Sequence, residues 1–85
     1  MNFIAKVFVM PKPAILDPQG KAIASSLRSL GYQEVGDVRL GKYITVRLDG
    51  ENREQASARV EEMCRRLLAN EVIEEFNFEL EEQAP

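Results

Sequence analysis

Residues 2–10 alternate between two sets of side chains, with the period of two that is typical of a β-strand. The two sets are Phe3, Ala5, Val7 and Val9 on one face, and Ile4, Lys6, Phe8 and Met10 on the other. Both faces are largely apolar, but the helices of a small domain cover one face of a sheet. The second face, with Ile4, Phe8 and Met10, is therefore predicted to pack against another subunit.

A helix is predicted to follow this strand. The strand ends at Pro11-Lys12-Pro13, because proline cannot donate to a ladder and biases the preceding residue toward extended geometry. Asp17 stands at the N-cap position and Pro18 at the first helical position, where a missing amide proton costs nothing. An apolar stripe follows at helical spacing, made of Ile23, Leu27 and Leu30. Gly31 then ends the helix in a left-handed conformation.

The stretch 38–48 allows two interpretations. Its apolar residues all fall on even positions: Val38, Leu40, Ile44, Val46 and Leu48. One long bent strand fits this pattern, and so does a hairpin with Gly41-Lys42-Tyr43 as its loop. The hairpin is favoured, because it places Leu40 opposite Ile44 and keeps the apolar side chains on one face.

A second helix is predicted from Asn52, which has Gln55 at the spacing of a capping box. Its buried stripe is predicted to comprise Ala56, Val60, Met63, Cys64, Leu67 and Leu68. Asn70 is expected to end the helix as a left-handed residue. A last strand then covers 72–80, with Phe76, Phe78 and Leu80 on one face.

The resulting order, βαββαβ, predicts an α+β fold of the ferredoxin-like kind. Right-handed crossovers place both helices on one face of a mostly antiparallel sheet, which gives a two-layer sandwich. Eighty-five residues suffice for one domain. We expect this domain to cover residues 1–81 and the acidic residues 82–85 to form a flexible tail.

Composition narrows the classes of function. The net charge of −3 and the pI near 5.0 argue against nucleic acid or an anionic membrane as partner. The chain has one cysteine, no apolar run long enough for a membrane span and no leader pattern, so a cytoplasmic location is expected. It has no histidine, the commonest general base and metal ligand near neutral pH. Independent catalysis is therefore not expected.

Residues that could carry chemistry also have simpler interpretations. Cys64 lies on the apolar stripe of the second helix, and the sequence gives it no histidine to lower its pKa, so we interpret it as a packing residue. The many glutamates lack the spacing of a calcium loop and are interpreted as a solvated face, without a metal site. Gly41 and Lys42 lack the rest of a phosphate-binding loop. Asp17 would repel an anion at the helix N-terminus that it caps.

Three motifs, in this order and spacing, resemble the PurS family. They are Asp17-Pro18-Gln19-Gly20, Val38-Arg39-Leu40-Gly41-Lys42-Tyr43, and the run from Cys64 to Glu74. PurS proteins are the small, non-catalytic subunits of phosphoribosylformylglycinamidine synthase, a purine-biosynthetic ligase that takes nitrogen from glutamine. The resemblance extends from the first predicted strand to about Glu81.

The resemblance implies a role in assembly. It implies a glutaminase subunit and an ATP-dependent synthetase subunit as partners, with this chain joining them, assisting ammonia transfer and forming a homodimer or larger oligomer. It implies no cofactor on this chain, with ATP and Mg on the synthetase. The residues at the family's motif positions are candidates for contact with partners: Asp17, Gly20, Arg39, Gly41, Lys42 and Asn70.

Two alternatives remain open at this point. A ferredoxin-like domain of this size can be a regulatory module that binds a small molecule at a dimer interface. The same topology also occurs in RNA-binding modules, for which Phe8 would be the best stacking residue. The acidic pI and the absence of an RNP-type pattern weigh against RNA.

Overall fold

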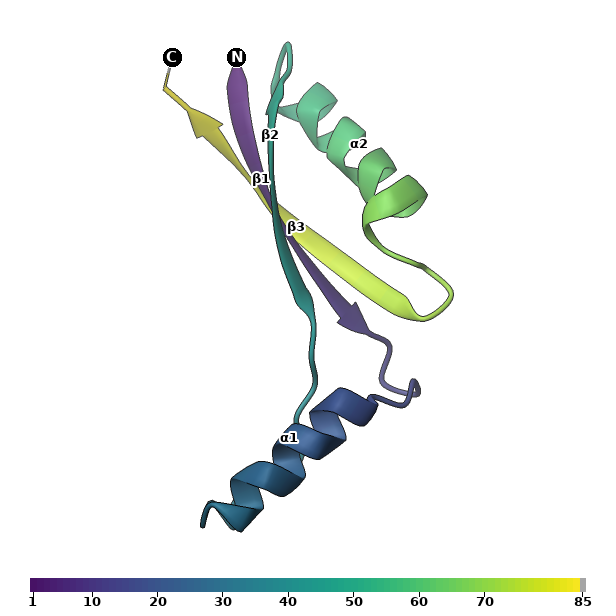
Figure 1. Cartoon of the computed structure of the whole chain (residues 1–85). Helices are drawn as coiled ribbons and strands as arrows, with labels where there is room; N and C mark the ends of the chain where they lie inside the picture. The colour runs from purple at the N-terminus through teal and green to yellow at the C-terminus, as the bar shows by residue number, and fades with distance from the viewer. Residues whose placement is uncertain (85) are drawn as a thin grey trace.

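The computed structural model describes residues 1–84 and contains three strands, two α-helices and one π-helical turn (Figure 1). In chain order these are β1 (Asn2–Pro11), α1 (Pro18–Ser29), β2 (Lys42–Asp49), α2 (Arg53–Met63), the π-helical turn η1 (Cys64–Leu68) and β3 (Glu74–Gln83). Among the described residues, no helix combines the length and the apolar character that a membrane crossing requires.

The sheet is antiparallel, with the order β2-β1-β3. Val7 at the centre of β1 lies opposite Ile44 of β2 and Phe78 of β3, so the apolar residues of all three strands share one face. This register confirms the predicted alternation in β1 and β3. The α+β class and the ferredoxin-like antiparallel arrangement are also confirmed.

The core lies between this face and α2. Phe3, Ala5, Val7 and Val9 are buried, as are Ala56, Val60 and Cys64 on the facing helix. Asn52 caps α2, because its side-chain oxygen accepts a hydrogen bond from the backbone N–H of Gln55 (2.8 Å). The predicted helix start and most of the predicted stripe are therefore confirmed.

Leu67 was predicted to be buried, and this is wrong: its side chain is 83% exposed. The cause is η1, in which the backbone N–H of Ala69 donates to the carbonyl of Cys64 (3.0 Å), a five-residue step. The additional residue in this turn rotates Leu67 outward. Ala69 is buried in its place, and Leu68 packs partly against the core.

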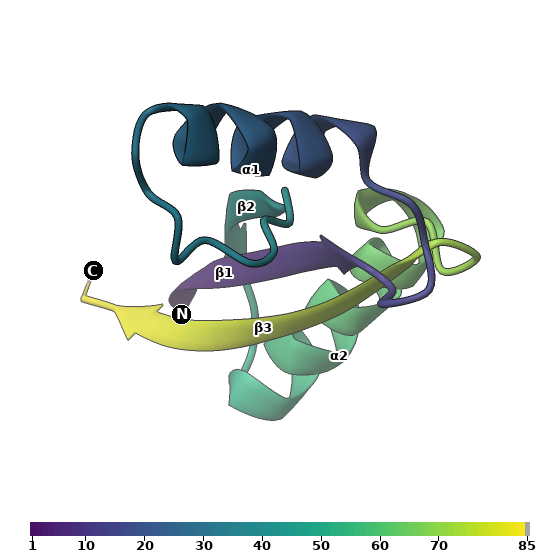
Figure 2. The same cartoon turned by 90° about the horizontal axis from the view of Figure 1, so that it is seen from below.

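Helix α1 has the predicted start and end. Asp17 is its N-cap, Pro18 its first residue, and Gly31 follows it with φ 109°. However, α1 projects beyond the ends of the strands and lies apart from α2 (Figures 1 and 2). The expectation that both helices cover one sheet face is therefore wrong: α2 alone covers it.

The hairpin predicted around Gly41 is also wrong. Residues 36–41 form no strand, and β2 begins only at Lys42. The reason is that this segment makes contacts with the start of α1, described below, and those contacts fix its path. At the other end of the chain, β3 continues through Gln83 and pairs Glu82 with Phe3, so residues 82 and 83 belong to the sheet and not to a tail. Pro85 lies outside the described residues.

Candidate functional site

The three motifs singled out in the sequence meet at one place, where the sheet ends and α1 begins. We call this place the neck and define it as residues 10–20, 38–42 and 70–74. A backbone hydrogen bond joins two of its segments, from the N–H of Lys12 to the carbonyl of Ile73 (2.9 Å). The neck therefore connects α1 to both edges of the sheet.

Asp17 links two segments of the neck with one carboxylate. One oxygen accepts from the backbone N–H of Gly20 (2.9 Å), which caps α1, and the other accepts from the N–H of Leu40 (2.8 Å). These two hydrogen bonds, first that of Leu40 and then that of Gly20, hold the pKa of Asp17 below its ordinary value. The nearby charge of Arg39 acts in the same direction. Asp17 thus caps α1 and also links the segment before α1 to the segment before β2.

Arg39 makes the reciprocal tie. Its guanidinium donates to the carbonyl of Ile15 (3.0 Å) and to that of Lys12 (2.9 Å). Hydrogen bonds from a charged donor are stronger than those between neutral groups. Together, Asp17 and Arg39 join the segment that enters α1 to the segment that leaves it, and this fixes where the helix points.

Gly20 and Gly41 permit the close packing of the neck. A Cβ atom at Gly20 would lie 2.1 Å from the carbonyl oxygen of Val38. A Cβ atom at Gly41 would lie 2.0 Å from the sulfur of Met10 and 2.6 Å from the carbonyl oxygen of Val9. All three distances are far below van der Waals contact, so each position requires glycine for close approach of the backbone.

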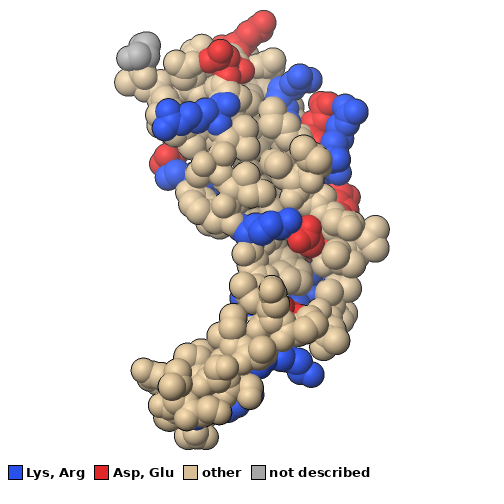
Figure 3. All heavy atoms as spheres, in the orientation of Figure 1, with Lys and Arg blue, Asp and Glu red and all other residues tan. Residues whose placement is uncertain are grey.

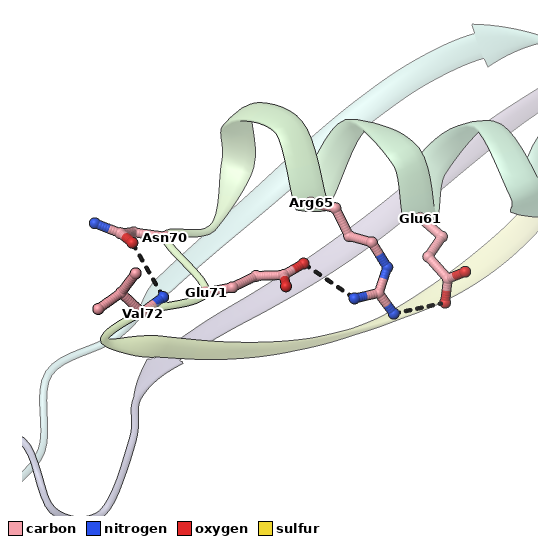
Figure 4. Close-up of polar contacts among 5 residues, drawn as sticks. All are labelled: Glu61, Arg65, Asn70, Glu71 and Val72. Atoms are coloured by element: carbon pink, nitrogen blue, oxygen red, sulfur yellow. Dashed lines mark hydrogen bonds and ion pairs between the residues drawn. The ribbon is translucent and has the colours of Figure 1, made fainter.

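Lys42 and Asn70 meet through a third residue, Glu74. Lys42 Nζ lies 3.6 Å from a Glu74 carboxylate oxygen, and the other oxygen accepts from the N–H of Asn70 (2.8 Å). The prediction that Asn70 is left-handed is wrong, because Gly31 alone has a positive φ among residues 1–84. Instead its side chain accepts from the N–H of Val72 (3.1 Å) and stabilises the turn into β3 (Figure 4).

The structure therefore brings all six predicted partner-contact residues into the neck. Asp17, Arg39 and Asn70 use their side chains for internal hydrogen bonds, and the two glycines are needed for packing. Glu74 was missed by the sequence analysis, although its position four residues after Asn70 could have suggested a local hydrogen bond. These residues position the neck, and the exposed groups beside them are the ones available to another molecule.

An apolar groove of about 360 Å³ runs beside the neck. Its walls include Leu16, which is 68% exposed, together with the exposed side chains of Leu40 and Ile73. Asp17 and Glu74 also line it, so the groove has an apolar wall and an acidic border. Exposed apolar side chains around a groove are typical of a protein-contact surface.

The second surface is the sheet face turned away from α2, which we call the open face. Its centre is formed by Ile4, Lys6, Phe8 and Met10 of β1. Ile4, Phe8 and Met10 therefore share one face, and their role in self-association stays a prediction. Phe8 is 37% exposed, and its ring stacks on that of Tyr43 with centroids 5.1 Å apart. Lys6 pairs with Glu81 at 2.9 Å. The space-filling view shows the molecule bent around a hollow between α1 and the lobe that contains the sheet and α2, which we call the sheet lobe (Figure 3).

The described residues offer little chemistry of their own. Cys64 is buried against the sheet, and burial raises the pKa of its thiol, opposite to what a nucleophile requires. Arg65 lies between Glu61 and Glu71 (Figure 4). Its guanidinium also sits over the Phe76 ring, 5.5 Å from the centroid. Residues 1–84 contain no group of three or more acidic, cysteine or histidine side chains that could hold a metal ion.

Known proteins resemble this chain along almost its whole length. The family model PurS, phosphoribosylformylglycinamidine (FGAM) synthase, matches residues 4–82. The PurS subunit of Bacillus subtilis is 47% identical over 77 residues, which cover 91% of this chain and 90% of the relative.

Solved structures agree in fold. PurS from Thermus thermophilus superposes with a TM-score of 0.86 at 35% identity, covering 99% of this chain and 100% of the other. A chain of the PurLQS structure from Thermotoga maritima gives 0.87 at 32% identity, covering 94% of this chain and 98% of the other. These matches, together with the three motifs that meet at the neck, show that the chain belongs to the PurS family of FGAM synthase subunits.

Proposed function

We propose that this chain acts as a non-catalytic assembly subunit of FGAM synthase, joining the glutaminase and the synthetase and assisting the passage of ammonia between them. One observation supports this most directly. The polar residues of its motifs are engaged in internal contacts at the neck, whereas apolar side chains remain exposed in the adjacent groove and on the open face. These exposed apolar surfaces are available for contact with other subunits.

The chemistry of nitrogen transfer explains why such a subunit is useful. The glutaminase releases ammonia from glutamine, and the synthetase uses ATP to activate the amide oxygen that ammonia displaces. Ammonia reacts only as the neutral amine, which water at neutral pH mostly protonates and dilutes. A closed, less polar passage disfavours the charged form and excludes water. Walls for that passage can come from a subunit that has no base of its own.

Each surface has a proposed partner. The groove beside the neck and the exposed stripe of α1 contact the larger subunits, with the neck residues setting the angle of α1. The open face binds a second copy of the chain and gives a homodimer or a larger oligomer. This chain itself holds no cofactor. ATP and Mg bind to the synthetase, and the complex works in the cytoplasm.

The regulatory small-molecule module is the weaker alternative, because membership in the PurS family already accounts for residues 4–82. A true ligand at 100 times its Kd would stabilise the chain by about 2.7 kcal/mol. A thermal-shift screen with amino acids and nucleotides would detect this.

The proposed function is tested by reconstitution. Purified glutaminase and synthetase from the same organism are assayed for FGAM formation, with and without this chain, using either glutamine or added ammonia as the nitrogen source. We expect the chain to be required with glutamine and dispensable with ammonia. If both reactions run as fast without the chain as with it, the bridging role is refuted.

A further inference from the structure

The exposed flank of α2 and η1 carries a small hollow that the proposed contacts do not involve. The hollow has a volume of about 230 Å³ and is lined by Arg59, Glu62, Met63, Arg66 and Leu67. These residues follow one another at helical spacing, so they form one stripe along the helix. Met63 is half-buried and the other four are exposed. We call this stripe the α2–η1 surface.

The α2–η1 surface has a positive border. Guanidinium nitrogens of Arg59 and Arg66 lie 3.8 and 3.4 Å from the Glu62 carboxylate. Both arginine side chains are largely exposed, and each guanidinium has more N–H donors than this one carboxylate can accept. Two arginines against one glutamate leave a positive charge here, in a chain whose net charge is −3. A partner with carboxylates would complement this border.

The apolar centre of the surface is produced by the backbone at η1. Continued α-helical spacing would turn Leu67 toward the core, on the side of Val60 and Cys64. The π-helical turn instead leaves Leu67 exposed beside Met63. Turns of this kind are rare and occur frequently at functional sites. The chain therefore gives up the burial of a leucine and leaves it available to another molecule.

From these observations we infer that the α2–η1 surface binds a segment of one larger FGAM synthase subunit, in which an apolar side chain is flanked by carboxylates. The inference rests on the proposed function and deepens it. The apolar side chain packs on Leu67 and Met63, and the carboxylates accept hydrogen bonds from Arg59 and Arg66. Hydrogen bonds between two charged groups are stronger than those between neutral groups, and they fix the register of the bound segment.

Other occupants fit this surface less well. Pockets for small ligands usually measure about 300–1,000 Å³, and this hollow is smaller and lies among exposed side chains. A membrane-bound helix needs a broad apolar face, whereas the apolar strip here is one leucine beside a half-buried methionine. A second copy that presented the same surface would set arginines against arginines, which is unfavourable.

The location of the surface suits a chain that joins two proteins. Such a chain needs two surfaces that both partners can occupy at once. Helices α1 and α2 lie apart, with strands of the sheet between them (Figures 1 and 2), and the molecule is 51 Å long. If one larger subunit binds at the α2–η1 surface, the groove and α1 remain free for the other.

Photo-crosslinking identifies the occupant directly. The amino acid p-benzoylphenylalanine replaces Leu67, and the chain is irradiated in the reconstituted synthase with glutamine, ATP and Mg. Mass spectrometry should find cross-links to a segment of one larger subunit in which apolar residues are flanked by Asp or Glu. Cross-links to a second copy of this chain, or to a segment without carboxylates, would overturn the inference.

Substitutions measure how much the surface contributes. Leu67→Asp and Arg66→Glu should each raise the chain concentration that gives half-maximal glutamine-dependent FGAM formation by about tenfold, as expected for central interface residues. Ammonia-dependent formation should not change. Ala58→Asp is the matched control, because it places the same charge at an exposed position of α2 that does not line the hollow. Circular dichroism verifies folding, and Leu67→Ala, which should also weaken the response, replaces Leu67→Asp if that variant does not fold.

The outcomes separate this docking site from the proposed function. A wild-type chain that is dispensable with glutamine would overturn both. A wild-type chain that is required with glutamine, but whose Leu67→Asp and Arg66→Glu variants need no higher concentration than Ala58→Asp, would overturn the docking site alone.

Discussion

The sheet lobe and the helix that projects from it, α1 with its C-cap Leu30, are stabilised in different ways. We call this projecting helix the α1 arm. In the lobe, α2 and the inner sheet face bury Phe3, Val7 and Val60 almost completely. In the arm, the buried residues of α1 are Gly20 and Ala24, whereas Ile23 is 39% and Leu30 is 74% exposed. The lobe is held by a packed core, and the arm is held by hydrogen bonds at the neck.

The overall dimensions also show that α1 extends away from the packed core. The radius of gyration is 16.7 Å, and the molecule measures 51 × 29 × 14 Å. A compact domain of this length would have a radius of gyration of about 12 Å. A chain that extends an amphipathic helix away from its core gains little packing energy from that helix by itself. The lobe therefore provides the stability, and in the proposed function the arm is the part that contacts other subunits.

The largest loss of stability is expected from a substitution in the core of the lobe. Phe3→Ala removes a buried ring, and the lost burial together with the cavity should lower the free energy of unfolding by about 3–5 kcal/mol. Leu30→Ala in the arm should change it by less than about 0.5 kcal/mol, because the side chain is already exposed. Urea unfolding of both variants measures the contrast. Equal losses would show that the arm has a core of its own.

The next largest loss of stability is expected from substitutions that overpack the neck. Gly41→Ala and Gly20→Ala place a Cβ atom within about 2 Å of neighbouring atoms, and overpacking of this kind costs about 1–3 kcal/mol. Gly36→Ala is the matched control in the same connection, since nothing lies within 4 Å of its Cβ position. It should be neutral or slightly stabilising. Similar losses at all three glycines would contradict the role of close packing in the neck.

A smaller effect should appear in the pH dependence of the neck. Because hydrogen bonds lower the folded-state pKa of Asp17, its stabilising contribution is fully present above its ordinary value of 3.8 and is lost as the pH falls through the lower folded-state pKa. Asp17→Asn removes this titration. The stability difference between wild type and variant, measured in urea from pH 6 to pH 2.5, should therefore shrink at the acid end. If the stability difference stays constant with pH, the titration of Asp17 does not contribute to the stability of the neck.

The smallest effect distinguishes the two leucines at the end of α2. Leu67→Ala should alter the unfolding free energy by no more than about 0.5 kcal/mol, because Leu67 faces solvent. Leu68→Ala should cost more, because Leu68 packs partly against the core. The reverse order in chemical denaturation would mean that the π-helical turn is absent in solution.

Much of the secondary structure could be predicted from the sequence, because its signals are local. Alternation in β1 and β3, the caps at Asp17 and Asn52 and the stop at Gly31 all rest on neighbouring residues. The open face of Ile4, Phe8 and Met10 followed from the same alternation. The residues of the three motifs lie together at the neck, and their contact with partners stays a prediction.

The errors arose where distant contacts override local patterns. The even-numbered apolar residues around Gly41 suggested a hairpin, but Asp17, 23 residues earlier, holds the Leu40 N–H and fixes the path of the chain. Helical spacing placed Leu67 inside, yet one residue added to the turn at Cys64 moved it outside. The position of α1 could not be inferred, because the crossover rule assumes a helix that returns to its own sheet.

The most direct test of the account asks whether the arm serves assembly. Leu30→Asp is compared with Ser29→Asp, a neighbouring exposed position that receives the same charge, in the reconstituted synthase with glutamine or with ammonia. We predict that Leu30→Asp leaves the unfolding free energy of the isolated chain unchanged but sharply lowers glutamine-dependent FGAM formation, while ammonia-dependent formation persists and Ser29→Asp behaves as wild type. Full glutamine-dependent activity with Leu30→Asp would contradict the account.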